Sequence, residues 1–402
     1  MLQVSVALPS ARTERFSLLQ SSKVGDLRVL AQKSFQRGFL RLVDADHGMV
    51  DPAVSLQAAG LADGDDLTAV VVEPKVVATS AAFAVFCCGG DRVVTWGAAL
   101  YGGDSSQVQD QLKAVQEVQA THFAFAAILA NGSVVTWGDP DSGGDSSGVQ
   151  HLLKGVQQVQ ASLGAFAAIL SDRSVVTWGD PDFGGDSSEV QDQLKSVEQI
   201  QATPSAFAAI LADGSVVTWG GLGPDGDSSE VPDQLTGVQQ VQASMFAFAA
   251  ILSDGSVLTW GDPDSGGDSS EVQHLLTGVQ QVQATSGAFA AILSDGAVVS
   301  WGHPNSGGDS SEVQHLLKGV QQVQATSGAF AAILSDGSVV SWGHPKSGGD
   351  SSEVQDQLKS VQKIQAAYRA FAAILADGSV VSWGDPGSGG DSSAVAAQFA
   401  FV

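Results

Sequence analysis

The stretch Ala288-Phe289-Ala290-Ala291-Ile292-Leu293-Ser294-Asp295-Gly296-Ala297-Val298-Val299-Ser300-Trp301-Gly302 decides the fold of this chain. Its apolar residues alternate before Asp295-Gly296, and a β-branched run follows. An Asp-Gly pair between two such runs is a strong signal for a β-hairpin, because the turn needs positive φ. A further strand is expected just before the hairpin, where Val282 and Ala284 alternate with glutamines. The stretch therefore predicts a unit of three short strands.

The same unit recurs along most of the chain with a strict period of 41 residues. Each tryptophan occupies the same position of the unit and is followed by glycine, at Trp96, Trp137, Trp178, Trp219, Trp260, Trp301, Trp342 and Trp383. Such a period marks one supersecondary unit that buries its apolar face by stacking on its neighbours. Short strands, with small alanines on the inner one and tryptophan between units, are typical of a β-propeller blade. We therefore predict a mainly β propeller of eight units over residues 75–402, with seven units or an open β-solenoid as alternatives.

The part of the unit after the tryptophan has a less certain form. Gly307-Gly308-Asp309-Ser310-Ser311 leads into Glu312-Val313-Gln314, and the segment ends at Leu316-Leu317. A serine before such a sequence can cap a short helix. The same residues are compatible with a fourth, outer strand. We expect a strand or an irregular edge here, with a helix as the alternative.

Residues 1–74 do not carry the repeat. Strict alternation over residues 2–8 predicts a strand, and residues 16–18 begin a second one. Apolar residues at 27, 30, 31 and 35 recur at helical spacing, and strands are expected again over 40–43 and 66–72. Strands around one helix in so short a segment predict a small α+β domain of the β-grasp type.

The charge of the chain narrows the range of its partners. The sequence has 43 Asp/Glu and 18 Lys/Arg, a net charge of −25. Seven of the cations and nine of the acids lie in residues 1–74, so the repeats carry most of the excess negative charge. Such a surface repels phosphate backbones and attracts basic groups. We expect a protein partner, possibly basic, and no nucleic acid.

The sequence also bears on location and redox state. The first residues lack the continuous apolar stretch of a signal peptide, and no apolar run reaches the roughly 18 residues that a membrane span needs. The only cysteines are the neighbours Cys87 and Cys88, which we interpret as small buried apolar residues in a reducing compartment. We expect a cytoplasmic or nuclear protein that does not bind a membrane.

The strongest candidate for chemistry is the acidic turn that begins at Asp262. Carboxylates at positions 1, 3, 7 and 10 of Asp262 to Glu271 have spacing that can wrap Ca²⁺. Two repeats later the third position is Lys346, which argues against a metal. We interpret the string as a turn closed by side-chain hydrogen bonds. No nucleophile, base or phosphate loop recurs, so we expect no catalytic residues, no metal, no cofactor and no enzymatic activity.

Two parts of the chain resemble known families. The core Leu-x-Asp-Gly-x-Val-x-x-Trp-Gly, as in Leu293 to Gly302, is similar to the repeat of the regulator-of-chromosome-condensation (RCC1-like) propellers. The strand-helix-strand order of residues 1–74 resembles ubiquitin-like domains, although no terminal Gly-Gly is present. HERC-type ubiquitin ligases contain similar propellers, but their catalytic domain has no counterpart here.

These resemblances imply a function and one candidate surface. They imply a non-catalytic scaffold whose propeller binds a protein and whose ubiquitin-like domain links that protein to ubiquitin or proteasome machinery. A regulator of a small GTPase or of chromatin is the alternative. In ubiquitin-like folds an apolar patch on the sheet is the usual contact surface, and Val43 and Val70 would form it here. Asp44, Ala45 and Asp46 beside Val43 make this patch more acidic.

Overall fold

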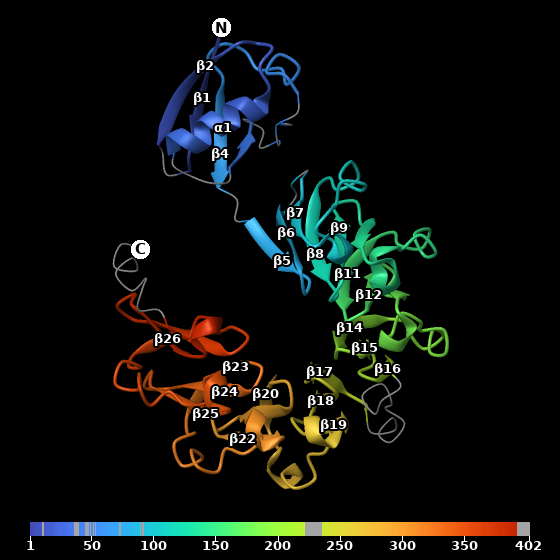
Figure 1. Cartoon of the computed structure of the whole chain (residues 1–402), viewed down its shortest axis with the longest axis vertical. Coiled ribbons are helices and arrows are strands. Elements are labelled where there is room, and N and C mark those ends of the chain that lie inside the picture. Colours follow the sequence, from blue (N-terminus) through green and yellow to red (C-terminus); the bar gives the residue numbers. More distant parts are fainter. Residues whose placement is uncertain are drawn as a thin grey trace.

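The computed structural model contains a small α+β domain followed by a curved array of β-sheets (Figure 1). It describes the chain except for residues 10–11, 36–39, 45–47, 49, 51, 53, 72–73, 89, 91, 222–234 and 392–402. Among the described residues, none of the helices has the length and apolar character that crossing a membrane would require.

The N-terminal domain is a four-stranded mixed sheet packed on one helix. Its elements are β1 (Leu2–Ala7), β2 (Thr13–Leu18), α1 (Val24–Phe35), β3 (Leu40–Val43) and β4 (Asp66–Val71), and the strand order is β2-β1-β4-β3. Strand β1 runs parallel to β4, while the other pairs are antiparallel. Leu27, Ala31 and Phe35 of the helix are buried against Val4 and Leu67 of the sheet. This is the β-grasp arrangement that the sequence predicts; Val72, placed in the last strand, lies outside the described residues.

The remaining described strands form eight three-stranded sheets. In chain order they are β5 (Pro74–Ala78), β6 (Ala82–Cys87), β7 (Val94–Gly97); β8 (Val115–Ala120), β9 (Ala124–Leu129), β10 (Val134–Gly138); β11 (Val156–Ala161), β12 (Ala165–Leu170), β13 (Val175–Gly179); β14 (Val197–Ala202), β15 (Ala206–Leu211), β16 (Val216–Gly220); β17 (Val238–Ala243), β18 (Ala247–Leu252), β19 (Val257–Gly261); β20 (Val279–Ala284), β21 (Ala288–Leu293), β22 (Val298–Gly302); β23 (Val320–Ala325), β24 (Ala329–Leu334), β25 (Val339–Gly343); β26 (Val361–Ala366), β27 (Ala370–Leu375) and β28 (Val380–Gly384).

Each sheet is built as the hairpin signal predicts. In the sixth, β21 pairs antiparallel with both β20 and β22, and Phe289 lies opposite Trp301. The turn between β21 and β22 places Gly296 at φ +79, and its N–H donates to the carbonyl of Leu293 at 2.9 Å. The alanine-rich strand is therefore the central strand of the sheet rather than the inner one, and the first strand lies on the concave side of the array (Figure 1).

The segment after each tryptophan forms turns. In the described residues it contains short helical turns and no fourth strand, so of the expected forms the irregular edge is present and the outer strand is wrong. A proline opens six of these eight turns and fixes the backbone φ, and a glycine with positive φ lies at or next to the end of each turn except η6, which ends at Leu276. The turns are η1 (Ala99–Tyr101), η2 (Pro140–Gly144), η3 (Pro181–Phe183), η5 (Pro263–Ser265), η6 (Gln273–Leu275), η7 (Pro304–Ser306), η8 (Pro345–Ser347) and η9 (Pro386–Ser388).

The apolar cores lie between sheets, not within them. Small residues of one sheet, such as Ala288 and Ala290, pack on Phe330 and Trp342 of the next. The described residues form seven such clusters, one for each pair of consecutive sheets, and none joins the eighth sheet to the first. The mainly β, propeller-type stacking that the sequence predicts is present, and the array traces an incomplete ring (Figure 1).

Candidate functional site

The repeated tryptophans fix the spacing between sheets. Seven of them are buried, whereas Trp96 in the first sheet is exposed. Each stacks on the phenylalanine opposite it in its own sheet, with ring centroids 5.1 to 5.3 Å apart. The indole N–H of Trp342 donates to the carbonyl of Gly307 in the preceding repeat at 3.0 Å, and five other buried tryptophans make the equivalent bond. These contacts make a rigid frame that carries the surface loops.

The Gly-Gly-Asp-Ser-Ser loop is fastened to its own sheet by a chain of hydrogen bonds. Ser310 donates to the side chain of Gln314 at 2.8 Å, and Gln314 in turn donates to the carbonyl of Val298 at 2.9 Å. The carboxylate of Asp309 accepts the backbone N–H of Ser311 at 2.9 Å. The loop therefore holds a carboxylate in a fixed place on the surface.

Loops of successive repeats enclose acidic grooves, which we take as the candidate site. One groove has a volume of about 940 Å³. It is bounded by the loop that follows the sixth sheet, the loop that follows the seventh sheet, and the last strand of the seventh sheet. Its lining combines the carboxylates of Asp309, Glu312 and Asp350 with apolar groups such as Leu316 and Trp342. One repeat earlier a groove of about 800 Å³ repeats this composition. The residues that line these two grooves include no Lys, Arg or His. Each groove therefore offers negative charge beside an apolar wall.

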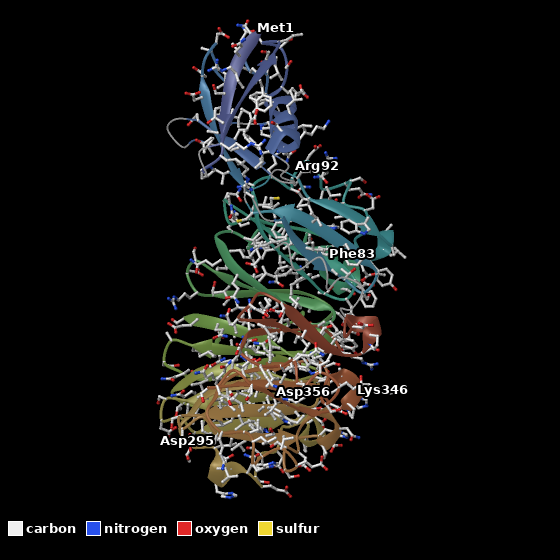
Figure 2. The ribbon with its side chains drawn as sticks, turned by 90° about the vertical axis from the view of Figure 1, so that its left-hand side faces the viewer. Met1, Phe83, Arg92, Asp295, Lys346 and Asp356 are labelled. Atoms are coloured by element: carbon white, nitrogen blue, oxygen red, sulfur yellow. The ribbon has the colours of Figure 1, made fainter. Side chains whose placement is uncertain are left out.

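The loop carboxylates have pKa values below the usual value of an aspartate. The pKa of Asp309 lies below its usual value because the backbone N–H and the hydroxyl of Ser311 donate to the carboxylate. The pKa values of Asp268 and Asp350 are lowered by the same bonds from Ser270 and Ser352. A second row is formed by the hairpin aspartates Asp172, Asp213, Asp254, Asp336 and Asp377, whose pKa values are lowered by the serine two residues later. Figure 2 shows the two edges, with Asp295 at the hairpin edge and Lys346 at the opposite one.

We expect the stability of the array to fall in acid. Because these pKa values are lower in the folded chain than in the unfolded one, the stability that they give is complete above the unfolded value of about 4 and is lost as pH falls through the lower folded values. The midpoint of thermal unfolding should therefore stay constant from pH 7 to about 5 and decline below about pH 4. A midpoint that rises on acidification would show instead that repulsion among the 43 acidic residues dominates.

Comparison with known proteins finds similar structures but no similar family or sequence. No family model and no curated protein sequence matches the chain. Among solved structures, Prp20p of Saccharomyces cerevisiae, described with its binding to Gsp1p and histones, is 16% identical over 59% of this chain and 73% of its own, with a TM-score of 0.37. The CRINKLY WD40 ectodomain of the Arabidopsis thaliana receptor kinase ACR4 is 17% identical over 65% and 90%, with a TM-score of 0.36. The ubiquitin of Caldiarchaeum subterraneum is 14% identical over 18% and 94%, with a TM-score of 0.17. These likenesses are too distant to carry a function.

The acidic string that we weighed as a calcium site is a set of hydrogen-bonded turns. Asp262 accepts the hydroxyl of Ser265 at 2.8 Å, and Asp139 and Asp180 accept backbone N–H groups of their own turns. These bonds hold one oxygen of each carboxylate within its own turn. The described residues contain no group of three His, Cys, Asp or Glu that could hold a metal ion.

The two valines of the proposed patch lie on one face of the N-terminal sheet. Val43 pairs with Thr68 and Val70 with Arg41, so the valines are diagonal neighbours on the face turned away from α1. Val70 is exposed and Val43 is half-buried. Arg41, on the same face, donates to the backbone carbonyls of Cys87 and Cys88 in the first repeat. The patch therefore borders the contact between the N-terminal domain and the array. Ala45 and Asp46 lie outside the described residues.

The two cysteines differ in their surroundings. Both are free thiols, but Cys87 is half-buried and Cys88 is exposed, so the expectation that both are buried is wrong. Burial raises the pKa of the Cys87 thiol, which Arg41 and Arg28 partly oppose. The equivalent residues of the sixth sheet, Leu293 and Ser294, are half-buried and exposed as well, so this exposure belongs to the end of the central strand.

Sequence reasoning missed the groove residues Glu312, Leu316 and Pro345. Glu312 and Leu316 were expected only in a strand or an irregular edge, and Pro345 was not singled out; the signal that these residues meet across repeats was the strict period itself. Loops that recur every 41 residues must lie side by side once the sheets stack.

Proposed function

We propose that the chain is a non-catalytic protein-interaction scaffold whose acidic grooves bind a lysine- or arginine-rich segment of another protein. The observation that carries this proposal is the groove lined by Asp309, Glu312 and Asp350 with an apolar wall beside them. A lysine or arginine side chain has an apolar stem and a charged head. Its stem would lie on the exposed Leu316 and Pro345, and its head would reach the carboxylates.

Repetition strengthens such binding. An equivalent groove lies one repeat earlier, and Asp309 lines both. A partner with several basic residues could occupy neighbouring grooves at once, and each occupied groove would raise the effective concentration for the next. The net charge of −25 would steer such a partner toward the array.

The N-terminal domain would couple this partner to other proteins. By its resemblance to ubiquitin-like domains, its patch of Val43 and Val70 is the surface that would contact ubiquitin or proteasome machinery. Since Arg41 on that face already binds the first repeat, a receptor would have to approach from the side of the exposed Val70. Binding of an isolated receptor domain that is lost on Val70→Asp would support this link.

The alternative is a regulator of a small GTPase or of chromatin. The histones named with Prp20p are basic proteins, so a histone tail has the chemistry that the grooves favour. A GTPase would instead require a folded docking surface. Comparing a histone-tail peptide, an unrelated peptide of equal charge and a nucleotide-free GTPase as ligands would separate the two readings.

We expect a fluorescently labelled lysine-rich peptide to bind the full chain and to bind less tightly as salt rises. Replacing the groove carboxylates in Asp309→Asn, Glu312→Gln and Asp350→Asn together should weaken binding by about tenfold, because each exposed charge pair contributes less than about 1 kcal/mol. Fluorescence anisotropy measures this directly. The matched control replaces three hairpin carboxylates at the opposite edge, Asp213→Asn, Asp254→Asn and Asp336→Asn, and removes the same charge. Equal losses in both triple variants would show that net charge, not the groove, binds the peptide.

A further inference from the structure

We propose that two copies of this chain bind head to tail, the first sheet of one copy stacking on the eighth sheet of the other. The first-sheet face consists of Val76, Phe83, Val94 and Trp96. The last-sheet face consists of Ala372, Ile374, Val380 and Gly389. These two faces are the two halves of an interface that the array already contains seven times.

The first-sheet face is apolar and uncovered. Phe83 is 44% exposed and Trp96 is 47% exposed, whereas their equivalents in the second sheet, Phe125 and Trp137, are 0% and 5% exposed. Val76 and Val94 are exposed as well, while the other side of this sheet is buried against the second sheet. Phe83 lies below the N-terminal domain in Figure 2, so that domain does not cover the face. Large apolar side chains exposed together mark a binding surface.

The last-sheet face has the complementary composition. Ile374 is 44% exposed, whereas its equivalent Ile333 in the seventh sheet is 5% exposed because the eighth sheet covers it. The surroundings of Gly389 also show that this face is covered by no described sheet. A Cβ atom at Gly348, one repeat earlier, would meet the ring of Phe371 at 2.6 Å, but at Gly389 nothing lies within 4 Å. The last-sheet face therefore has room for the phenylalanine and tryptophan of another sheet.

Two sets of hydrogen bonds link consecutive repeats, and in the part of the chain that the structure describes each set leaves an unpaired donor on one of the two faces and an unpaired acceptor on the other. Within the described residues, the indole N–H of Trp96 has no partner and neither does the carbonyl of Gly389, although the equivalent pair Trp383 and Gly348 is bonded at 2.9 Å. A second set links the concave side of consecutive repeats, where the N–H of Ser327 donates to the carbonyl of Tyr368 at 2.9 Å.

This second set also ends at the two faces. It begins with Ser80, whose N–H donates to the carbonyl of His122, and in the described part of the chain the carbonyl of Ser80 accepts no bond. At the other end the N–H of Tyr368 likewise has no acceptor there. Stacking a second copy's first sheet on the eighth sheet would join Trp96 to Gly389 and Tyr368 to Ser80 in the direction used at the internal interfaces.

The occupant is a second copy rather than the other end of the same chain. Six of the seven internal interfaces carry the same Trp-Gly bond, which is 2.9 to 3.1 Å long, so consecutive sheets stack in the same way along the array. With this stacking, the first and eighth sheets do not meet (Figure 1). A second copy can complete both faces without changing any internal interface.

The contact is heterologous, because two different faces meet, so one such contact leaves a free face at each end for a further copy. The net charge of −25 on each copy opposes association. Salt screens this repulsion but does not weaken apolar burial. Self-association should therefore strengthen with salt, in contrast to the binding of a basic peptide.

The test is sedimentation of the full chain over a range of concentrations at about 0.1 M and about 0.5 M NaCl. We expect the mass to rise with concentration, and more steeply at the higher salt. Trp96→Ala and Ile374→Arg, one on each face, should each weaken self-association by about 30-fold or more, as loss of a central interface residue does. Leu152→Ala, an exposed leucine away from both faces, is the control and should change nothing. Circular dichroism checks that each variant is folded.

Mixing the two variants gives the decisive result. Trp96→Ala keeps an intact last-sheet face and Ile374→Arg keeps an intact first-sheet face, so a mixture of the two should form a one-to-one dimer that grows no further. A mixture that stays monomeric would overturn the proposal. So would a wild-type chain that keeps the mass of one copy at every concentration; protection of residues 82–97 and 370–384 from hydrogen exchange would then show that the ring closes on itself.

Discussion

Replacing Phe330 with alanine should destabilise the array by about 3–5 kcal/mol. Phe330 is fully buried between the sixth and seventh sheets and stacks on Trp342 with ring centroids 5.3 Å apart. Its ring also covers Gly307 of the preceding repeat. Neither Gly307 nor the rigid ring of Trp342 can move into the space that the phenylalanine ring leaves, so the substitution creates a cavity. The cost is then the lost burial plus the cavity itself.

Chemical denaturation monitored by circular dichroism measures this loss. Repeat arrays unfold with nearest-neighbour cooperativity, so the variant should separate the unfolding of the sheets on either side of the cavity into two steps. The matched control is Phe83→Ala, the same substitution at the equivalent position of the first sheet, where the ring is exposed. Under conditions in which the chain is monomeric, the control should cost much less. Equal costs at the two positions would contradict the seven-interface description.

Replacing Gly348 with alanine should cost about 2–5 kcal/mol, because two penalties add. The added Cβ would lie 2.6 Å from a ring carbon of Phe371, which is buried and has no room to move. The backbone at Gly348 also has φ +94, a conformation that residues with a Cβ rarely adopt. The substitution should push the eighth sheet away from the seventh and break the bond from Trp383.

Gly389→Ala separates these two penalties. Gly389 has φ +92, nearly the same as Gly348, but nothing lies within 4 Å of its Cβ position. Its cost in the monomer should be limited to the backbone strain of about 1–2 kcal/mol. Thermal or urea unfolding of the two variants measures the difference. If both glycines tolerate alanine equally, the close approach of consecutive repeats is not what fixes their spacing.

Local signals in the sequence were sufficient for the elements. The Asp295-Gly296 pair predicted the hairpin between β21 and β22, and the alternation before it gave the strands to within a few residues. The strands and the helix of the N-terminal domain followed in the same way. These signals depend on residues that are neighbours in the chain, so no knowledge of packing was needed.

The segment from Gly307 to Leu317 was only partly predicted. Its alternation is compatible with a strand, yet it forms turns, because Ser310 and Gln314 bond to their own loop and sheet instead of extending a ladder. Side chains that satisfy the backbone locally compete with strand formation. The acidic groove could not be predicted at all from one repeat, since its walls belong to two.

The sequence by itself determined the unit, its period, the pairing within each sheet and the excess of negative charge. These follow from short-range patterns copied along the chain. Only the tertiary structure decided that the described sheets share seven interfaces, with the outer faces of the first and eighth sheets covered by no other described sheet. Trp96 and Trp383 are each followed by glycine, but only Trp383 has a sheet of the array before it. Whether a face is covered depends on the curvature summed over all repeats, a property that no single repeat contains.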